Sequence, residues 1–235
     1  MSRSLVLACN CASENEPVVV GHAVIRPKPE YHGNWESLLA TTGSVLHFSQ
    51  DSDIYGEGAE ADTLYRIVSG IVRTCSFLSD GRRHIDSFYD EGDMFGFEVG
   101  HVHRLSAEAV SDCTVIAYRR CTVERLAAEN NVLARQMFSC AMRNMAHAQN
   151  HCLLLARKSA VEKVATFLTE WADPSPRMEM KALAMTRQDI ADYLGLTIET
   201  VSRTLSQLER DAMIELHTAR HIRIRNPVAL RALIA

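Results

Sequence analysis

Residues 186–209 read TRQDIADYLGLTIETVSRTLSQLE, and this stretch decides the fold of the C-terminal part of the chain. Thr186, with Asp189 three positions later, has the pattern of a capped helix start, and Gly195 permits a sharp turn where that helix ends. Thr197 caps a second helix, whose apolar positions recur at spacings of four and three: Val201, Leu205 and Leu208. The stretch predicts a helix, a glycine turn and a second helix.

The second helix of this motif carries polar side chains on its outer face. In the DNA-binding form of the motif, the first residues of this helix meet base edges in the major groove. Arginine can donate two hydrogen bonds to guanine, glutamate can accept one from the cytosine amino group, and serine or an apolar side chain suits thymine. The side chains predicted to contact bases are Ile198, Glu199, Ser202 and Arg203. Those placed for phosphate contacts are Thr186, Gln188, Thr197 and Thr200.

Two short strands are predicted beyond the motif, at residues 214–217 and 221–225. They would form a wing, on which Arg220, Arg223 and Arg225 attract phosphate without regard to base sequence. The C-terminal module is therefore predicted to be a winged helix-turn-helix. The alternative is a pair of helices that only packs within the protein and never touches DNA.

Residues 43–120 alternate short apolar runs with glycine turns, which is typical of antiparallel β structure. Asp80 and Gly81 separate two of these runs and suit the positive φ angles of a tight hairpin. Residues 1–27 show no sustained periodicity and end in RPKP, so they are predicted to form a mobile arm or a loosely docked strand.

The periodicity becomes helical near residue 120, where Thr122 is predicted to cap a helix with Glu124 in its first turn. A long helix follows over residues 130–156, and another over 160–171. One stripe of the long helix suits pairing with a second copy of the chain; the alternative is packing against the β structure of the same chain. The stripe consists of Leu133, Met137, Cys140, Asn144, His147, His151 and Leu154.

The chain has 235 residues, a formal charge of −4 and 47% hydrophobic residues, which suits a globular protein of two domains. The patterns divide it into an arm (1–27), a β domain (28–129), a dimerisation helix (130–157) and a DNA-binding domain (158–235). Seven cysteines without a CxxC pair indicate reduced thiols in the cytoplasm. No stretch has the ~20 apolar residues of a membrane span, and no enzymatic activity is expected.

The chain resembles the CRP/FNR family of bacterial transcription regulators, nearest its FNR and FixK branches. The resemblance covers about residues 36–235 and rests on the motifs at 61–70, 91–96 and 195–203. It implies an α+β fold with an N-terminal antiparallel β-roll like that of cyclic-nucleotide-binding proteins, a long dimerisation helix and a C-terminal winged helix-turn-helix. It also implies a homodimer that binds double-stranded DNA and touches RNA polymerase.

Within the family, the pattern Glu-x-x-Ser-Arg accompanies TTGAT-type half-sites, and Glu199, Ser202 and Arg203 match it. Members that respond to cyclic AMP carry arginine where Ile198 stands. The resemblance therefore implies an activator that recognises a TTGAT-N4-ATCAA-like palindrome. The genes expected under its control serve low-oxygen, respiratory or nitrogen-fixation metabolism.

The sequence departs from the family's cofactor-binding patterns, so no cofactor and no metal are expected. Residues 104–107 read RLSA and place Leu105 where an arginine would grip the phosphate of a cyclic nucleotide. Cys9 and Cys11 are too few and wrongly spaced for an iron-sulfur cluster of the FNR type. These two are instead candidates for oxidation, whereas the predicted apolar fillers are Cys113, Cys121 and Cys140.

Two alternative functions depend on histidines. A haem-based or nitric-oxide sensor of the same family would need an axial ligand, for which the candidates are His22, His32, His47 and His84. A cupin-type metalloenzyme would use His101, His103 and Glu108, although no second glycine-rich motif with a third ligand histidine follows them.

Overall fold

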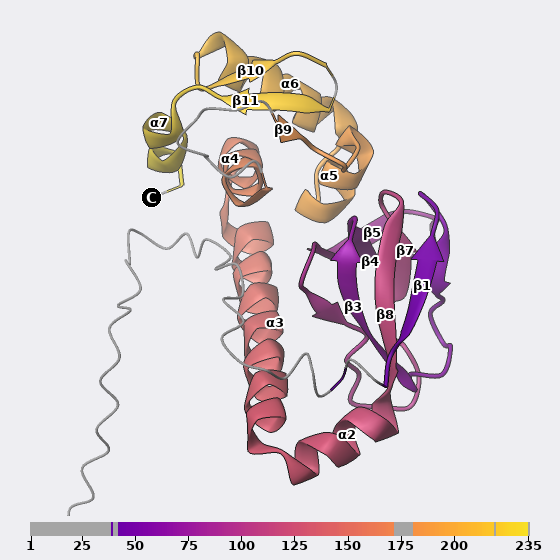
Figure 1. The fold of residues 1–235 in the computed structure, drawn as a ribbon. Coiled ribbons are helices and arrows are strands. Elements are labelled where there is room, and N and C mark those ends of the chain that lie inside the picture. The colour runs from indigo at the N-terminus through magenta and orange to yellow at the C-terminus, as the bar shows by residue number, and fades with distance from the viewer. Residues whose placement is uncertain (1–38, 40–41, 172–180, 219, 235) are drawn as a thin grey trace, which may run out of the picture.

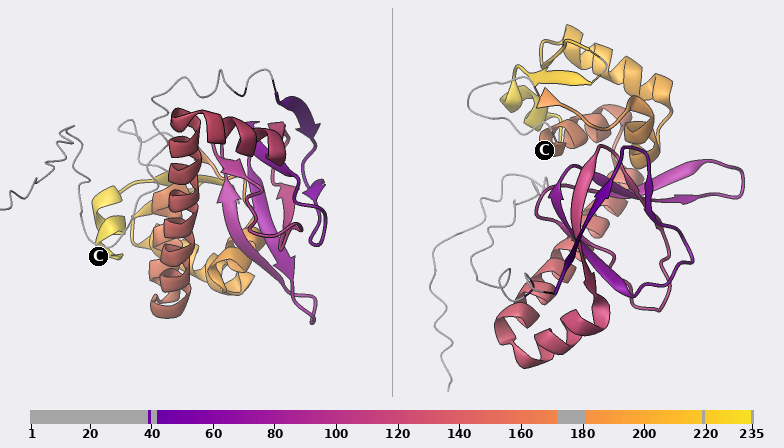
Figure 2. Two further views of the ribbon diagram at one scale, coloured as in Figure 1. Left: turned by 90° about the horizontal axis from the view of Figure 1, so that it is seen from below. Right: turned by 45° about the vertical axis from the view of Figure 1, so that its right-hand side comes forward.

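The structure is a computed structural model that describes residue 39 and residues 42–171, 181–218 and 220–234. A β-roll, a long helix beside it and a C-terminal winged domain follow one another along the chain (Figure 1). The right-hand view of Figure 2 shows that the winged domain sits at one end of both the roll and the long helix. The predicted arm at 1–27 lies outside the described residues.

The β-roll consists of two antiparallel four-stranded sheets, with strand orders β1-β8-β3-β6 and β2-β7-β4-β5. Alternate side chains of both sheets point inward, and Ile67, Val72 and Val115 are completely buried between them. The strands are β1 (Ser44–Phe48), β2 (Asp53–Tyr55), β3 (Thr63–Ser69), β4 (Val72–Phe77), β5 (Arg83–Tyr89), β6 (Met94–Phe95), β7 (Ser106–Ala109) and β8 (Cys113–Arg119).

The predicted hairpin at Asp80 and Gly81 is confirmed, because β4 and β5 pair antiparallel on either side of it. Gly81 has a φ of 83°, which a residue with a side chain adopts only at a cost. The Asp80 carboxylate accepts hydrogen bonds from the backbone and the side chain of Arg82 and so braces the turn.

The prediction that Thr122 caps a helix is wrong. Helix α2 (Arg120–Glu129) begins two residues earlier, directly after β8, and no side chain caps it. The Arg120 N–H instead donates to the Asp62 carbonyl oxygen, so the register of the sheet fixes where the helix starts. Helix α3 (Asn131–Arg157) follows, with the side chain of Asn130 accepting hydrogen bonds from its first free N–H groups.

The stripe of α3 that was predicted to pair with a second copy faces its own chain instead. Leu133 and Cys140 pack against Leu64 and Tyr118 of the roll, and His151 and Leu154 are buried toward the C-terminal domain. The apolar side chains exposed on α3 lie elsewhere on the helix: Val132, Phe138, Met142, Met145 and Leu153.

The C-terminal domain combines helices with a three-stranded sheet of order β10-β11-β9. The predicted wing is confirmed as β10 and β11, whereas β9 and α7 were not predicted. Its elements are α4 (Ala160–Trp171), β9 (Lys181–Ala182), α5 (Arg187–Leu194), α6 (Ile198–Arg210), β10 (Ile214–Leu216), β11 (His221–Ile224) and α7 (Pro227–Ala232). In the described part of the chain, no helix has both the length and the apolar character that crossing a bilayer requires.

Candidate nucleic-acid interface

Helices α5 and α6 form the predicted helix-turn-helix, with the predicted caps. The Thr186 side chain accepts from the Asp189 N–H, and the Asp189 side chain accepts from the Thr186 N–H, which makes a complete capping box. Gly195 ends α5 in the left-handed conformation, with φ 61° and ψ 41°. The Thr197 hydroxyl then accepts from the Thr200 N–H and starts α6.

Helix α6 is divided into a buried face and an open face. Val201, Leu205 and Leu208 lie in the core of the domain, each no more than 1% exposed. The four side chains predicted to contact bases share the first two turns of the opposite face, where all are exposed except Ser202, which is half-buried: Ile198, Glu199, Ser202 and Arg203. The structure brings these residues together, and their contact with DNA stays a prediction.

Interactions within the motif keep Glu199 ionised and leave the donors of Arg203 largely available on this open face. The Glu199 N–H and the Thr197 hydroxyl donate to the Glu199 carboxylate and lower its pKa, and the charge of Arg203 lowers it further. Glu199 therefore stays ionised and offers only acceptors, as reading a cytosine amino group requires. Arg203 Nη2 lies 3.5 Å from Thr200 Oγ1, a long contact that leaves most of its donors free.

The sequence reasoning missed one residue of this face. Arg187, at the start of α5, donates from Nη1 to the Ser202 Oγ at 3.2 Å and so orients a predicted base-contacting hydroxyl. Its position between Thr186 and Gln188, two predicted phosphate contacts, was the available signal. The contact itself crosses the turn between two helices, so helical periodicity does not reveal it.

The four predicted phosphate contacts all have partners inside the protein. The Thr186 hydroxyl donates to Asp189 Oδ2 at 2.7 Å, and Gln188 donates to Asp192 Oδ1 at 2.6 Å. The hydroxyls of Thr197 and Thr200 lie 3.1 Å apart. Contact with a phosphate would require the threonine hydroxyls to exchange partners, whereas the Gln188 amide has a second N–H to donate. All four contacts stay predictions.

The wing is less positive than its sequence suggests. Arg223 and Arg225 both form ion pairs with Glu215, at 3.3 and 2.9 Å, so their charge is partly neutralised within the wing. Arg220 is exposed beside the turn between the two strands. Of the three wing arginines, Arg220 is the one best placed to attract phosphate.

Aromatic rings fill the interior of the roll. Tyr55 stacks on His103 with ring centroids 3.6 Å apart, and Tyr65 stacks on Phe95 at 5.1 Å. At the stretch where a nucleotide phosphate would be gripped, Arg104 is exposed and forms an ion pair with Glu98 at 2.9 Å. The residues present therefore do not fit a cyclic nucleotide.

Glu108, the carboxylate ligand that a cupin-type metal site would use, is engaged by other side chains. Glu108 accepts from Arg73 Nε at 2.7 Å and from the Cys75 thiol at 3.4 Å, so its oxygens are already occupied. Among the described residues, no three histidine, cysteine or acidic side chains are grouped so as to hold a metal ion. Of the haem-ligand candidates, His47 contacts the Thr114 hydroxyl and His84 stacks on His151, while His22 and His32 lie outside the described residues.

The cysteines divide by burial. Cys113 and Cys140 are buried as predicted, but Cys121 is exposed, so its assignment as an apolar filler is wrong. Burial, and after it the charge of Glu108, raises the pKa of the Cys75 thiol to about 12, so that it donates to Glu108 as a neutral thiol. Cys9 and Cys11 lie outside the described residues.

Both domains match families of known proteins. Residues 45–130 match the family model of the cyclic nucleotide-binding domain, and residues 162–233 match that of the Crp-like helix-turn-helix domain. Over 201 residues the chain is 42% identical to the nitrogen fixation regulation protein FixK of Azorhizobium caulinodans, which covers 83% of this chain and 81% of that protein. The chain belongs to the CRP/FNR family, in its FixK-like branch.

Further relatives extend the match. FixK of Rhizobium meliloti is 40% identical over 189 residues, which cover 80% of this chain and 86% of that protein. The solved structure of FixK2 from Bradyrhizobium japonicum superposes with a TM-score of 0.77 at 43% identity, covering 83% of this chain and 98% of that one. The predicted α+β fold is confirmed, and the chain is a helix-turn-helix transcription regulator of the CRP/FNR type.

Proposed function

We propose that the chain is a homodimeric activator that reads a TTGAT-N4-ATCAA-like palindrome in cytoplasmic DNA. The observation that carries the proposal is the shared open face of Ile198, Glu199, Ser202 and Arg203 on the first two turns of α6. In helix-turn-helix complexes these are the turns that enter the major groove. The roll and the other helices leave this face uncovered.

The chemistry of this face suits the proposed half-site. Arg203 can donate two hydrogen bonds to the guanine of TTGAT, and Glu199 can accept from the cytosine amino group on the opposite strand. Ile198 offers an apolar surface to a thymine methyl group. Arg187 holds the Ser202 hydroxyl beside them, so the four side chains form one reading surface.

The exposed apolar side chains of α3 support the homodimer. Phe138, Met142, Met145 and Cys152 recur at spacings of four, three and seven, which places them on one face of the helix. Phe138 is 67% exposed, an unusual state for a phenylalanine beside other apolar side chains. We assign this face to the same helix of a second copy, because a two-fold dimer places two recognition helices on a palindrome.

The relatives support the regulatory role. Two are nitrogen fixation regulation proteins, and the transcriptional activatory protein AadR of Rhodopseudomonas palustris is 39% identical over 211 residues. We assign to this chain the activation of genes for nitrogen fixation, respiration or low-oxygen metabolism, through contact with RNA polymerase. None of this requires a catalytic centre.

Binding of the freshly purified protein to a TTGAT-N4-ATCAA duplex and to a scrambled duplex of the same composition tests the proposal. Both affinities are measured across a salt series, because phosphate contacts dominate affinity and weaken with salt. We expect a preference for the palindrome that persists as salt is raised. Equal, salt-sensitive binding to both duplexes would contradict the proposed reading of bases.

A further inference from the structure

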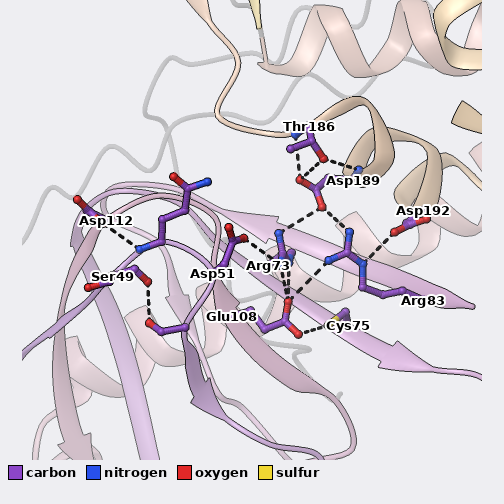
Figure 3. Close-up of polar contacts among 12 residues, drawn as sticks. Ser49, Asp51, Arg73, Cys75, Arg83, Glu108, Asp112, Thr186, Asp189 and Asp192 are labelled. Atoms are coloured by element: carbon purple, nitrogen blue, oxygen red, sulfur yellow. Dashed lines mark hydrogen bonds and ion pairs between the residues drawn. The ribbon is translucent and has the colours of Figure 1, made fainter. Parts of the chain in front are cut away.

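A cluster of buried charges joins the roll to the first helix of the reading motif (Figure 3). We call it the interdomain cluster; its members are Arg73 on β4, Arg83 on β5, Glu108 on β7, and Asp189 and Asp192 on α5. Arg73 Nη1 donates to Asp189 Oδ1 at 3.2 Å, and Arg83 Nε donates to Asp192 Oδ2 at 2.8 Å. Arg83 Nη2 donates to the same Oδ1 of Asp189.

These contacts differ from surface ion pairs in their burial. The side chains of Arg73 and Asp189 are 8% and 3% exposed, and those of Arg83 and Asp192 are 17% and 12% exposed. Ions that are withdrawn from water need fixed partners, so separating α5 from the roll would leave buried charges without them until water entered. The cluster therefore resists separation of the two domains.

Asp189 serves two purposes at once. Its Oδ2 accepts from the Thr186 N–H at 2.9 Å and from the Thr186 hydroxyl at 2.7 Å, which caps α5. Its Oδ1 accepts from both arginines of the roll. The start of α5 is thus tied to the roll through the same carboxylate that fixes where the helix begins.

The other end of α5 is held by the helices that connect the domains. His151 Nε2 of α3 lies 2.8 Å from the Tyr193 carbonyl oxygen, and Lys163 Nζ of α4 donates to the Leu194 carbonyl oxygen at 3.2 Å. Helix α5 is thereby fixed at both ends. Helix α6 follows it rigidly, because a tight turn at Gly195 and the bond from Arg187 to Ser202 join the two.

We propose that Arg73 and Arg83 are positioning residues for DNA reading. Together they hold α5 against the roll, and so fix the separation and relative orientation of the two recognition helices in the dimer. This inference rests on the proposed function. Its consequence is selectivity for spacer length, because each base pair added to the spacer moves a half-site by about 3.4 Å and turns it by about 35° around the helix axis. The open face of α6 stays exposed, so the contact positions the reading helix and does not cover it.

Arg83→Met is the most informative variant. It removes the contacts to Asp189 and Asp192 and the 3.8 Å ion pair with Glu108, while Arg73 remains to neutralise Asp189 and Glu108. Asp192→Asn is a milder second variant that removes the charge of one partner of Arg83 but keeps an acceptor oxygen. Arg104→Met is the matched control, because it removes an arginine of the roll whose partner, Glu98, belongs to the roll as well.

Affinities are measured for palindromes with spacers of three, four, five and six base pairs, for a single half-site and for a scrambled duplex. Hydrogen exchange of the α5 amides is measured without DNA, since it reports local opening. In Arg83→Met we expect the preference for the four-base-pair spacer to fall about tenfold, a typical coupling between sites. Half-site affinity should stay within about twofold of the wild type, and α5 should exchange faster than in Arg104→Met.

An unchanged spacer preference in Arg83→Met would overturn the inference, whether or not the α5 amides exchange faster. So would tighter binding to the palindrome with its spacer preference intact, which would make the cluster inhibitory. If wild-type protein does not distinguish the half-site from the scrambled duplex, the proposed function fails. The exchange of α5 then separates the two failures: faster exchange in Arg83→Met still shows that Arg83 holds α5 against the roll, and unchanged exchange overturns the positioning contact as well.

Discussion

Replacing Arg203 by alanine isolates the chemistry of one side chain. Arg203 is exposed on the second turn of α6, and the core face of that helix does not include it. Inside the protein it makes the 3.5 Å approach to Thr200, and its charge acts on Glu199. The free energy of unfolding should therefore change by less than about 0.5 kcal/mol, as for other surface substitutions.

The effect on DNA binding should be much larger. A bidentate contact between arginine and guanine contributes about 1–3 kcal/mol of discrimination. The dimer loses this contact in both half-sites, so the cost is about 2–6 kcal/mol, or a factor of about 30 to 20,000 in Kd. The loss should depend on the guanine: a duplex with that base pair changed in both half-sites should bind the variant and the wild type about equally.

Fluorescence anisotropy at one salt concentration measures this, with the palindrome, its single-base variants and a scrambled duplex. Arg210→Ala is the matched control, because Arg210 is an exposed arginine of the same helix that lies in its last turn. An unchanged base preference in Arg203→Ala would refute the contact between Arg203 and guanine. Equal losses for the two variants would refute it as well, since general attraction to phosphate would then explain both.

Three further outcomes follow from the structure. Phe138→Glu should give a monomer in size-exclusion chromatography with light scattering, whereas Val99→Glu, at a position that is 99% exposed, should leave the dimer intact. Gly195→Ala should lower the free energy of unfolding by about 1–2 kcal/mol in a denaturant titration, because its φ of 61° disfavours a side chain. Burial lowers the pKa of His151 in the folded protein. As the pH falls below about 6.5, His151 therefore takes up a proton in the unfolded chain before it does so in the folded protein. The free energy of unfolding falls from that pH down to the pKa of His151 in the folded state. Between pH 7 and pH 5, the free energy of unfolding should therefore fall less in His151→Phe than in the wild type. The fall that the variant still shows should include a contribution from His103, because burial lowers its pKa as well.

Local signals in the sequence located the reading motif correctly. The cap at Thr186, the left-handed Gly195 and the buried face of α6 all depend on residues within four positions of one another, so the order of side chains nearly determines them. The hairpin at Gly81 was predicted for the same reason. Thr122 shows the limit of a local signal, because the pairing of β8 with β3 starts α2 two residues before this capping residue.

The sequence by itself determined the helix-turn-helix, the four side chains predicted to contact bases and most of the other elements, but not β9, α7 or the contact of Arg187. Only the tertiary structure decided which face of α3 packs against the roll, since a helical stripe that includes Leu133 and Cys140 is compatible with a second copy as well as with the roll. It alone revealed the interdomain cluster, in which Arg73 meets Asp189 across 116 positions of the chain. Charged residues in a strand and at a helix start ordinarily face water. Burial reverses that expectation when the fold brings opposite charges together, and periodicity along the chain carries no information about partners so distant.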